Sequence, residues 1–185
     1  MRLFAERGYH ATSNAEVAEA ADLTRGAMLY HFPTREDLVQ AAIDHIQERR
    51  IAALAEAARD ALPGGELSDQ AIDAYWDLLP EPPFRAFTEL EAAARTDPDL
   101  AARIAPAQAA FDHAQIGGDL FGLLQAGADA RFQTSRDLAR FMLEGLARAS
   151  LTYDQDERTE RLMTVIKRVT RALNRKGEVK DLWED

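Results

Sequence analysis

The sequence contains no cysteine among its 185 residues, which excludes a disulfide framework, a thiolate zinc site and a cysteine nucleophile. It also lacks any run of about 18 apolar residues, so we predict no membrane-spanning helix and no membrane partner. The first ten residues, MRLFAERGYH, lack the apolar stretch of a secretory signal peptide. We therefore expect a cytoplasmic protein.

Positive charge is scarce as well. The chain has 22 Lys and Arg against 32 Asp and Glu, which gives a net charge of −10. Taken alone, this charge argues against nucleic acid as a partner, because phosphate binding needs a basic surface. Residues 1–50 carry six arginines against eight acidic residues. A nucleic-acid interface must therefore depend on where individual residues are placed rather than on bulk charge.

Strand signals are nearly absent. Ala, Leu, Glu and Arg dominate, and apolar residues recur three and four positions apart along most of the chain, which predicts an all-α fold. Pro and Gly mark the limits of the predicted helices. These cover about residues 1–7, 13–21, 24–32, 33–62, 68–79, 134–152 and 156–176, with one helix from the Pro80–Pro83 run to Asp97 and another after Pro98 that Pro106 should kink or break.

Residues 13–32 hold two short predicted helices joined by Asp22-Leu23-Thr24, a connector that allows only a sharp corner. Leu23 is expected to fill the angle between the helices, and Gly26 with Ala27 keeps the second helix slim enough for close approach to a partner. This arrangement is typical of a helix-turn-helix, whose second helix enters the DNA major groove. Helical hairpins are also common as plain packing corners, so spacing alone leaves both interpretations open.

Three segments resemble the N-terminal domain of the tetracycline-repressor (TetR) family: LFAERGYHATS (3–13), LTRG (23–26) and HFPTREDL (31–38). They occur in the family's order and spacing over about residues 1–48. The resemblance implies a helix-turn-helix DNA-binding domain (1–48) joined by a long helix to a helical effector-binding and dimerisation domain (49–176), with a charged tail (177–185). It further implies a homodimeric transcriptional repressor that a small-molecule effector releases from a double-stranded DNA operator.

The resemblance also implies the DNA contacts. Arg25 is the best candidate to read a guanine, because its guanidinium offers a fork of donors. Thr34 and Arg35 are expected to clamp a phosphate strand through hydroxyl, charge and helix dipole. The predicted DNA-binding residues are Thr12, Ser13, Thr24, Arg25, Gly26, Tyr30, His31, Thr34 and Arg35. The predicted small core is Phe4, Val17, Leu23, Met28 and Phe32.

The sequence departs from the family at two places. Leu29 stands where the family usually has tyrosine, with Tyr30 beside it. The family carries a longer first helix preceded by a basic arm, whereas Met1 to Arg7 supply about two turns. We expect a late-assigned start codon or a truncated relative with weak operator affinity. The alternative interpretation is therefore a helical ligand-binding and dimerisation protein with impaired DNA binding.

The larger, acidic part has aromatic residues at helical spacing, which usually form core. The resemblance implies that its helices enclose an effector pocket, with candidate lining residues Trp76, Phe87, Glu91, Phe111 and His113. The last two predicted helices carry apolar stripes and small residues at Gly145 and Ala149. Such a pair packs on its own domain or against a second copy, and the resemblance favours the second copy.

An enzyme is the main rival class. None of the four histidines lies three residues after a carboxylate, and no zinc-protease motif, phosphate-binding loop or nucleotide-binding glycine pattern is present. We therefore predict no catalytic residue, no metal and no cofactor.

Overall fold

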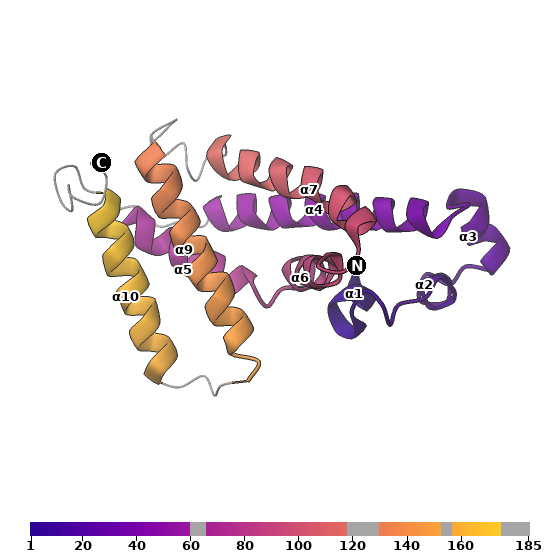
Figure 1. Ribbon diagram of the computed structural model, residues 1–185, viewed down its shortest axis with the longest axis horizontal. Coiled ribbons are helices and arrows are strands. Elements are labelled where there is room, and N and C mark those ends of the chain that lie inside the picture. Colours follow the sequence, from indigo (N-terminus) through magenta and orange to yellow (C-terminus); the bar gives the residue numbers. More distant parts are fainter. Residues whose placement is uncertain (60–65, 118–129, 153–156, 175–185) are drawn as a thin grey trace. The chain divides into compact units, whose positions relative to one another are not determined.

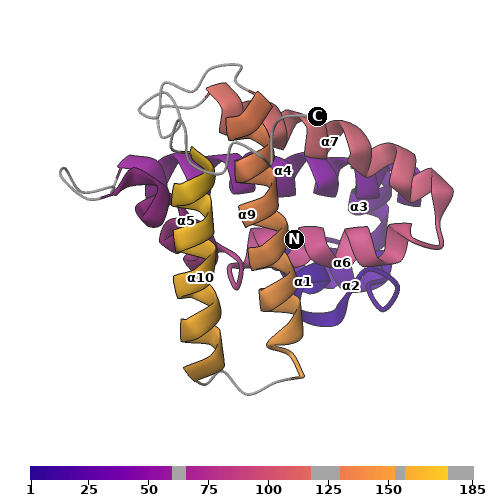
Figure 2. The same cartoon turned by 60° about the vertical axis from the view of Figure 1, so that its left-hand side comes forward.

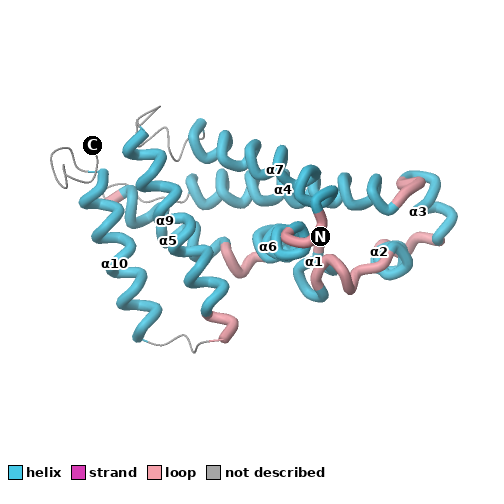
Figure 3. The backbone as a smooth tube through the Cα atoms, in the orientation of Figure 1, coloured by secondary structure: helices cyan, strands magenta, loops and turns pink. Residues whose placement is uncertain are grey.

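The computed structural model describes residues 1–59, 66–117, 130–152 and 157–174. Within these ranges every regular element is a helix (Figure 3), which confirms the all-α prediction. The helices are α1 (Arg2–Arg7), α2 (Asn14–Ala20), α3 (Arg25–His31), α4 (Arg35–Arg59), α5 (Leu67–Leu78), α6 (Pro82–Ala94), α7 (Pro98–Gly117), α9 (Ala130–Ala149) and α10 (Glu157–Asn174) (Figure 1).

The chain divides into two compact units. The first combines residues 1–53 with 81–114, and the second combines residues 54–80 with 115–185. The sequence-based division at residue 48 differs from this one, because α6 and most of α7 cluster with the N-terminal helices. Periodicity along the chain carries no information on which distant segments meet, so this discontinuous grouping was not predicted.

The first unit is built on one apolar core shared by α1, α4, α6 and α7. Ile43 and Ile46 of α4 and Leu90 of α6 are fully buried in it. Helix α1 packs along α6, and its Phe4 is only 5% exposed. A helix of six residues is not stable alone in water, so burial of Phe4, worth about 2 kcal/mol or more, holds α1 in place.

The second unit contains α5, α9 and α10, each of which contacts the other two (Figure 2). Their shared core includes Ile72, Leu143 and Ile166. Polar contacts fix the three helices further: the Tyr75 hydroxyl donates to a Glu144 carboxylate oxygen at 2.8 Å, and ion pairs join Lys167 to Asp73 at 2.6 Å and Arg171 to Asp69 at 3.4 Å.

Most helix limits lie within a few residues of the predicted ones. Helix α5 begins at Leu67, just before the expected Ser68 or Asp69, and α9 begins at Ala130 instead of Thr134. Pro106 lies inside α7, which continues from Pro98 to Gly117. A break was one of the two outcomes expected there, and it does not occur. Residues 60–62 of the predicted long helix and the charged tail 177–185 lie outside the described residues.

Across the described ranges, no helix combines the length and apolar character that a bilayer crossing requires.

Candidate nucleic-acid interface

Helix α2 begins with a complete capping box. The Ser13 hydroxyl oxygen accepts a hydrogen bond from the Glu16 N–H at 3.3 Å, and a Glu16 carboxylate oxygen accepts from the Ser13 N–H at 2.8 Å. Arg7 reaches the other Glu16 oxygen at 2.7 Å. The hydrogen bonds from the Ser13 backbone and hydroxyl, with a smaller effect of Arg7, lower the pKa of Glu16. This arrangement fixes the start of a helix only seven residues long.

The lowered pKa of Glu16 predicts a pH-dependent stability. The contribution is fully present above the ordinary Glu pKa of about 4.3 and disappears as pH falls through the lowered value. Glu16→Gln keeps an oxygen acceptor for the Ser13 N–H but does not titrate. We therefore expect wild type to lose thermal stability relative to Glu16→Gln between about pH 6 and pH 3. Thermal unfolding followed by circular dichroism tests this, and a difference that stays constant with pH would contradict it.

A backbone motif closes the corner between α2 and α3. The Leu23 N–H donates to the Ala18 carbonyl at 2.9 Å and the Asp22 N–H to the Glu19 carbonyl at 3.0 Å. These are the two bonds of a Schellman motif. Asp22 sits at φ 54°, a left-handed conformation that Asp tolerates better than most residues. The turn is therefore set by main-chain hydrogen bonds.

The role predicted for Leu23 is corrected by this geometry. Its side chain is 43% exposed and does not fill the angle between the helices. The backbone bonds close the corner without it. Of the predicted small core, Phe4 and Met28 are buried, at 5% and 2% exposure, and Val17 and Phe32 are half-buried.

Helix α3 presents a polar and slim outer face. Its N-cap Thr24 accepts from the Ala27 N–H at 3.1 Å, and the buried Met28 anchors the inner side. Arg25, Gly26 and Tyr30 are exposed, Tyr30 at 84%. A Cβ added at Gly26 would meet only Thr24 Oγ1, at 3.9 Å, an ordinary contact. The fold itself therefore tolerates a side chain at Gly26.

The other predicted DNA-binding residues differ in whether their side chains are exposed. Ser13, His31 and Thr34 are exposed. Thr12 is 2% exposed and its hydroxyl donates to the Gly8 carbonyl at 2.8 Å, so this side chain is not presented to a phosphate. Thr34 forms a second capping box, in which its hydroxyl donates to Asp37 Oδ2 at 2.7 Å and accepts from the Asp37 N–H at 3.1 Å.

Arg35 points into the fold. Its Nη1 donates to the Thr12 carbonyl at 3.1 Å and to Asn14 Oδ1 at 3.3 Å, and its Nη2 donates to the Tyr9 carbonyl at 3.5 Å. The guanidinium carbon also lies 5.2 Å from the centre of the Tyr9 ring. Nothing in the sequence indicates these partners, because they lie more than 20 positions away along the chain.

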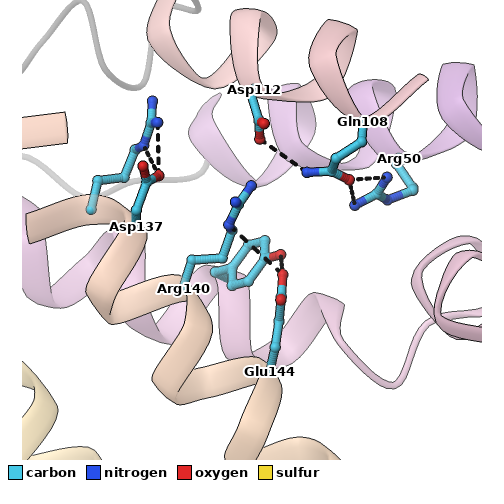
Figure 4. A network of polar contacts seen from close by, with 8 residues as sticks. Arg50, Gln108, Asp112, Asp137, Arg140 and Glu144 are labelled. Atoms are coloured by element: carbon cyan, nitrogen blue, oxygen red, sulfur yellow. Dashed lines mark hydrogen bonds and ion pairs between the residues drawn. The ribbon is translucent and has the colours of Figure 1, made fainter. Parts of the chain in front are cut away.

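Two of the candidate effector-pocket residues meet around a buried arginine. The guanidinium carbon of Arg50 lies 3.8 Å from the centre of the Phe87 ring and 3.9 Å from that of Phe111, and the side chain is 3% exposed. Its Nη atoms donate to Gln108 Oε1 at 3.4 and 3.5 Å (Figure 4). Sequence reasoning missed Arg50, although it lies four positions after the buried Ile46 and so shares the inner face of α4.

The other three candidates are placed differently. Glu91 is half-buried on α6, and Trp76 is half-buried on α5, in the second unit. His113 is exposed on α7. The assignment of these three residues to an effector pocket stays a prediction.

The second unit exposes apolar residues at helical spacing on α9 and α10. Phe141 is 57% exposed and Val165 is 52% exposed, and a Cβ added at Gly145 would meet nothing within 4 Å. Ile166 and Leu173 of the stripe predicted for the last helix are buried, and α9 buries Leu143, which the stripe predicted for that helix does not include. We name the outward set the α9–α10 stripe: Leu138, Phe141, Gly145, Leu162, Val165 and Val169.

The known proteins that this chain is similar to are described as transcriptional regulators. Residues 1–42 match the family of bacterial regulatory proteins called the tetR family. The chain is 31% identical over 91 residues to the HTH-type transcriptional regulator TtgR of Pseudomonas putida, an alignment covering 48% of this chain and 43% of that one. It is 34% identical over 116 residues to an HTH-type transcriptional repressor of Mycobacterium tuberculosis, covering 58% and 62%. The chain thus spans less than two thirds of these relatives.

Solved structures share the fold. A chain from Rhodococcus sp. described as a TetR-family transcriptional regulator superposes with a TM-score of 0.66 at 22% identity, covering 94% of each chain. GusR of Salmonella enterica superposes with a TM-score of 0.65 at 23% identity, covering 92% of this chain and 88% of that one. The likeness therefore extends well beyond the N-terminal segments.

Proposed function

The chain belongs to the TetR family of bacterial regulatory proteins, and on this premise we propose that it is a DNA-binding transcriptional repressor. The observation that carries the proposal is the outer face of α3. Arg25 is exposed at the start of this helix, beside a glycine that the fold does not require. An arginine at the beginning of a recognition helix can donate two hydrogen bonds to one guanine in the major groove.

The residues that we propose to contact DNA are predicted DNA-binding residues whose side chains are exposed. Ser13, Thr24, Tyr30 and His31 are exposed on α2, α3 and their caps, and they are proposed to contact phosphates and sugars, which set the register. Arg25 and the slim surface at Gly26 are proposed to face base edges.

We propose that the protein acts as a homodimer through the α9–α10 stripe. A monomer that leaves Phe141 and Val165 more than half exposed has an apolar surface suited to association. A second copy would complete a four-helix bundle. A dimer also supplies two α3 helices, one for each of the two half-sites that dimeric helix-turn-helix proteins bind about 34–36 Å apart on DNA.

Release by a small-molecule effector is proposed to act through α4. This helix begins directly after the helix-turn-helix and continues to the buried Arg50 beside Phe87 and Phe111. A ligand that favours one placement of α4 over another would change the spacing of the two α3 helices. Such coupling requires only a difference in ligand affinity between the two states.

Replacement of Arg25 tests the proposal. A duplex that the protein binds is first selected from a random library. Fluorescence anisotropy titrations then give the affinity of the protein for this selected duplex and for a duplex with a shuffled sequence. We expect Arg25→Ala to weaken the selected complex by about 10- to 100-fold, since a bidentate base contact is worth about 1–3 kcal/mol. The shuffled duplex should lose far less.

Arg49→Ala is the matched control, because Arg49 is an exposed arginine on α4 and its loss changes the net charge equally. It should leave the ratio of the two affinities unchanged. If Arg25→Ala weakens both duplexes by the same factor, Arg25 contacts only phosphate and does not read sequence.

A further inference from the structure

We infer that Arg35 is a positioning residue that holds the helix-turn-helix on the start of α4, and that it does not contact DNA phosphate. The inference rests on the proposed function, since what Arg35 positions is the proposed DNA-reading helix. Its side chain is half-buried and directed at the segment between α1 and α2. A phosphate contact through these donors would require them to leave their acceptors in the fold.

The contacts of Arg35 suit a guanidinium specifically. Its two terminal nitrogens donate hydrogen bonds to three acceptors: the carbonyls of Tyr9 and Thr12 and the side-chain oxygen of Asn14. The Tyr9 ring lies beside the planar group, with its centre 5.2 Å from the guanidinium carbon. An ammonium group is a compact point charge and cannot spread over acceptors in this way.

These acceptors control the placement of α2. Tyr9 and Thr12 belong to the connection that precedes this helix, and Asn14 is its first residue. The Thr12 hydroxyl ties the same connection back to the Gly8 carbonyl at 2.8 Å. Because the Schellman motif fixes α3 to α2, one side chain on α4 sets the approach of both helices. The rest of α4 is fixed to α6 through Ile43 and Ile46 in the core.

The neighbouring helix starts reinforce this assignment. Glu16 occupies the N-terminus of α2 and Asp37 that of α4, each through its own capping box. Glu16 accepts hydrogen bonds from the backbone N–H and the hydroxyl of Ser13, and Asp37 accepts those of Thr34. Glu36 and Asp37 also place negative charge in the first turn of α4, directly after Arg35, and this charge disfavours a second anion there.

Arg35→Lys distinguishes positioning from phosphate binding, because it keeps the charge and removes the planar fork. We expect Arg35→Lys and Arg35→Ala to weaken the selected duplex about equally, by about 10-fold or more. The slope of log affinity against log salt between about 50 and 200 mM should stay at the wild-type value for both. Arg49→Lys is the matched control and should bind as wild type does.

A second readout needs no DNA. Hydrogen–deuterium exchange of the free protein should show faster exchange in residues 9–20 for Arg35→Lys than for wild type or Arg49→Lys, with the amides of α9 and α10 unchanged. Loss of the helix signal in the second unit would indicate general unfolding, which also contradicts a local positioning role.

The opposite results overturn the inference. Wild-type affinity for Arg35→Lys together with a salt slope lowered by about one for Arg35→Ala would make Arg35 a phosphate contact. Unchanged exchange in residues 9–20 would remove the positioning role. If the library yields no preferred duplex, the proposed function fails, whereas the exchange experiment still decides the role of Arg35.

Discussion

Replacing Gly145 by arginine is expected to abolish dimerisation and to lower affinity for a two-half-site duplex by about 10²- to 10⁴-fold, the factor that linking two binding modules supplies. The reason is local. A Cβ at Gly145 meets no atom within 4 Å in the single chain, so the fold accommodates a side chain there. The same position lies on the exposed stripe beside Phe141, where a charged side chain would prevent a second copy from packing closely.

Gly145→Ala is the matched control. It adds one methyl group, improves helix propensity by about 1 kcal/mol, and should leave the dimer largely intact. Val165→Asp, at an exposed position on α10, should reproduce the effect of arginine from the other helix. Sedimentation velocity gives the oligomeric state and circular dichroism the helix content. A Gly145→Arg protein that remains dimeric would show that the α9–α10 stripe is not the dimer interface.

The second large effect is expected at Leu90, which is fully buried in the core shared by α1, α4, α6 and α7. Leu90→Ala should lower the free energy of unfolding by about 2–5 kcal/mol, because it removes buried methyl groups and leaves a cavity. Total stability is typically about 5–15 kcal/mol, so this loss is a large fraction. Because Phe4 packs in the same core, α1 should become less protected along with α6.

Leu151 provides the same chemical change without burial, since its side chain is 82% exposed. Leu151→Ala should change the free energy of unfolding by about 0.5 kcal/mol or less. Urea titration of both variants measures the two values under one condition. Equal losses at the two positions would mean that α6 does not form the core of its unit.

The sequence was sufficient for the elements and their order because these depend on local signals. Ser13 and Thr24 each cap the helix that their side chains favour, and Pro82 opens α6 as its fixed φ allows. The exposed position of Tyr30 on α3 also follows from helical periodicity, because Tyr30 lies two positions after the buried Met28.

Contacts between segments that lie far apart in the chain could not be predicted from the sequence. The motif predicts phosphate contacts for Thr12 and Arg35, whereas in the structure both donate hydrogen bonds to carbonyls within the fold. The sequence predicts a core position for Leu23, because it does not reveal the main-chain hydrogen bonds that close the turn. One sequence shows which side chains can donate hydrogen bonds but not which acceptors the fold brings to them.

The burial of Arg50 could be predicted only in part from the sequence. Its position after Ile43 and Ile46 places it on the buried face of α4 by period alone, yet arginine is usually exposed. The aromatic partners that allow its burial, Phe87 and Phe111, come from α6 and α7. Their approach to α4 is a property of the folded unit.

Whether α3 recognises DNA sequence is decided by comparing the affinity of the protein for two duplexes. A labelled duplex recovered from a random library is titrated with the protein at about 150 mM salt, alongside a shuffled duplex of identical composition. Binding to the recovered duplex is expected to be at least about 10³-fold tighter than binding to the shuffled one. Equal affinity for the two, or no binding to either, would contradict sequence recognition by α3 and would favour a helical ligand-binding protein that does not recognise an operator.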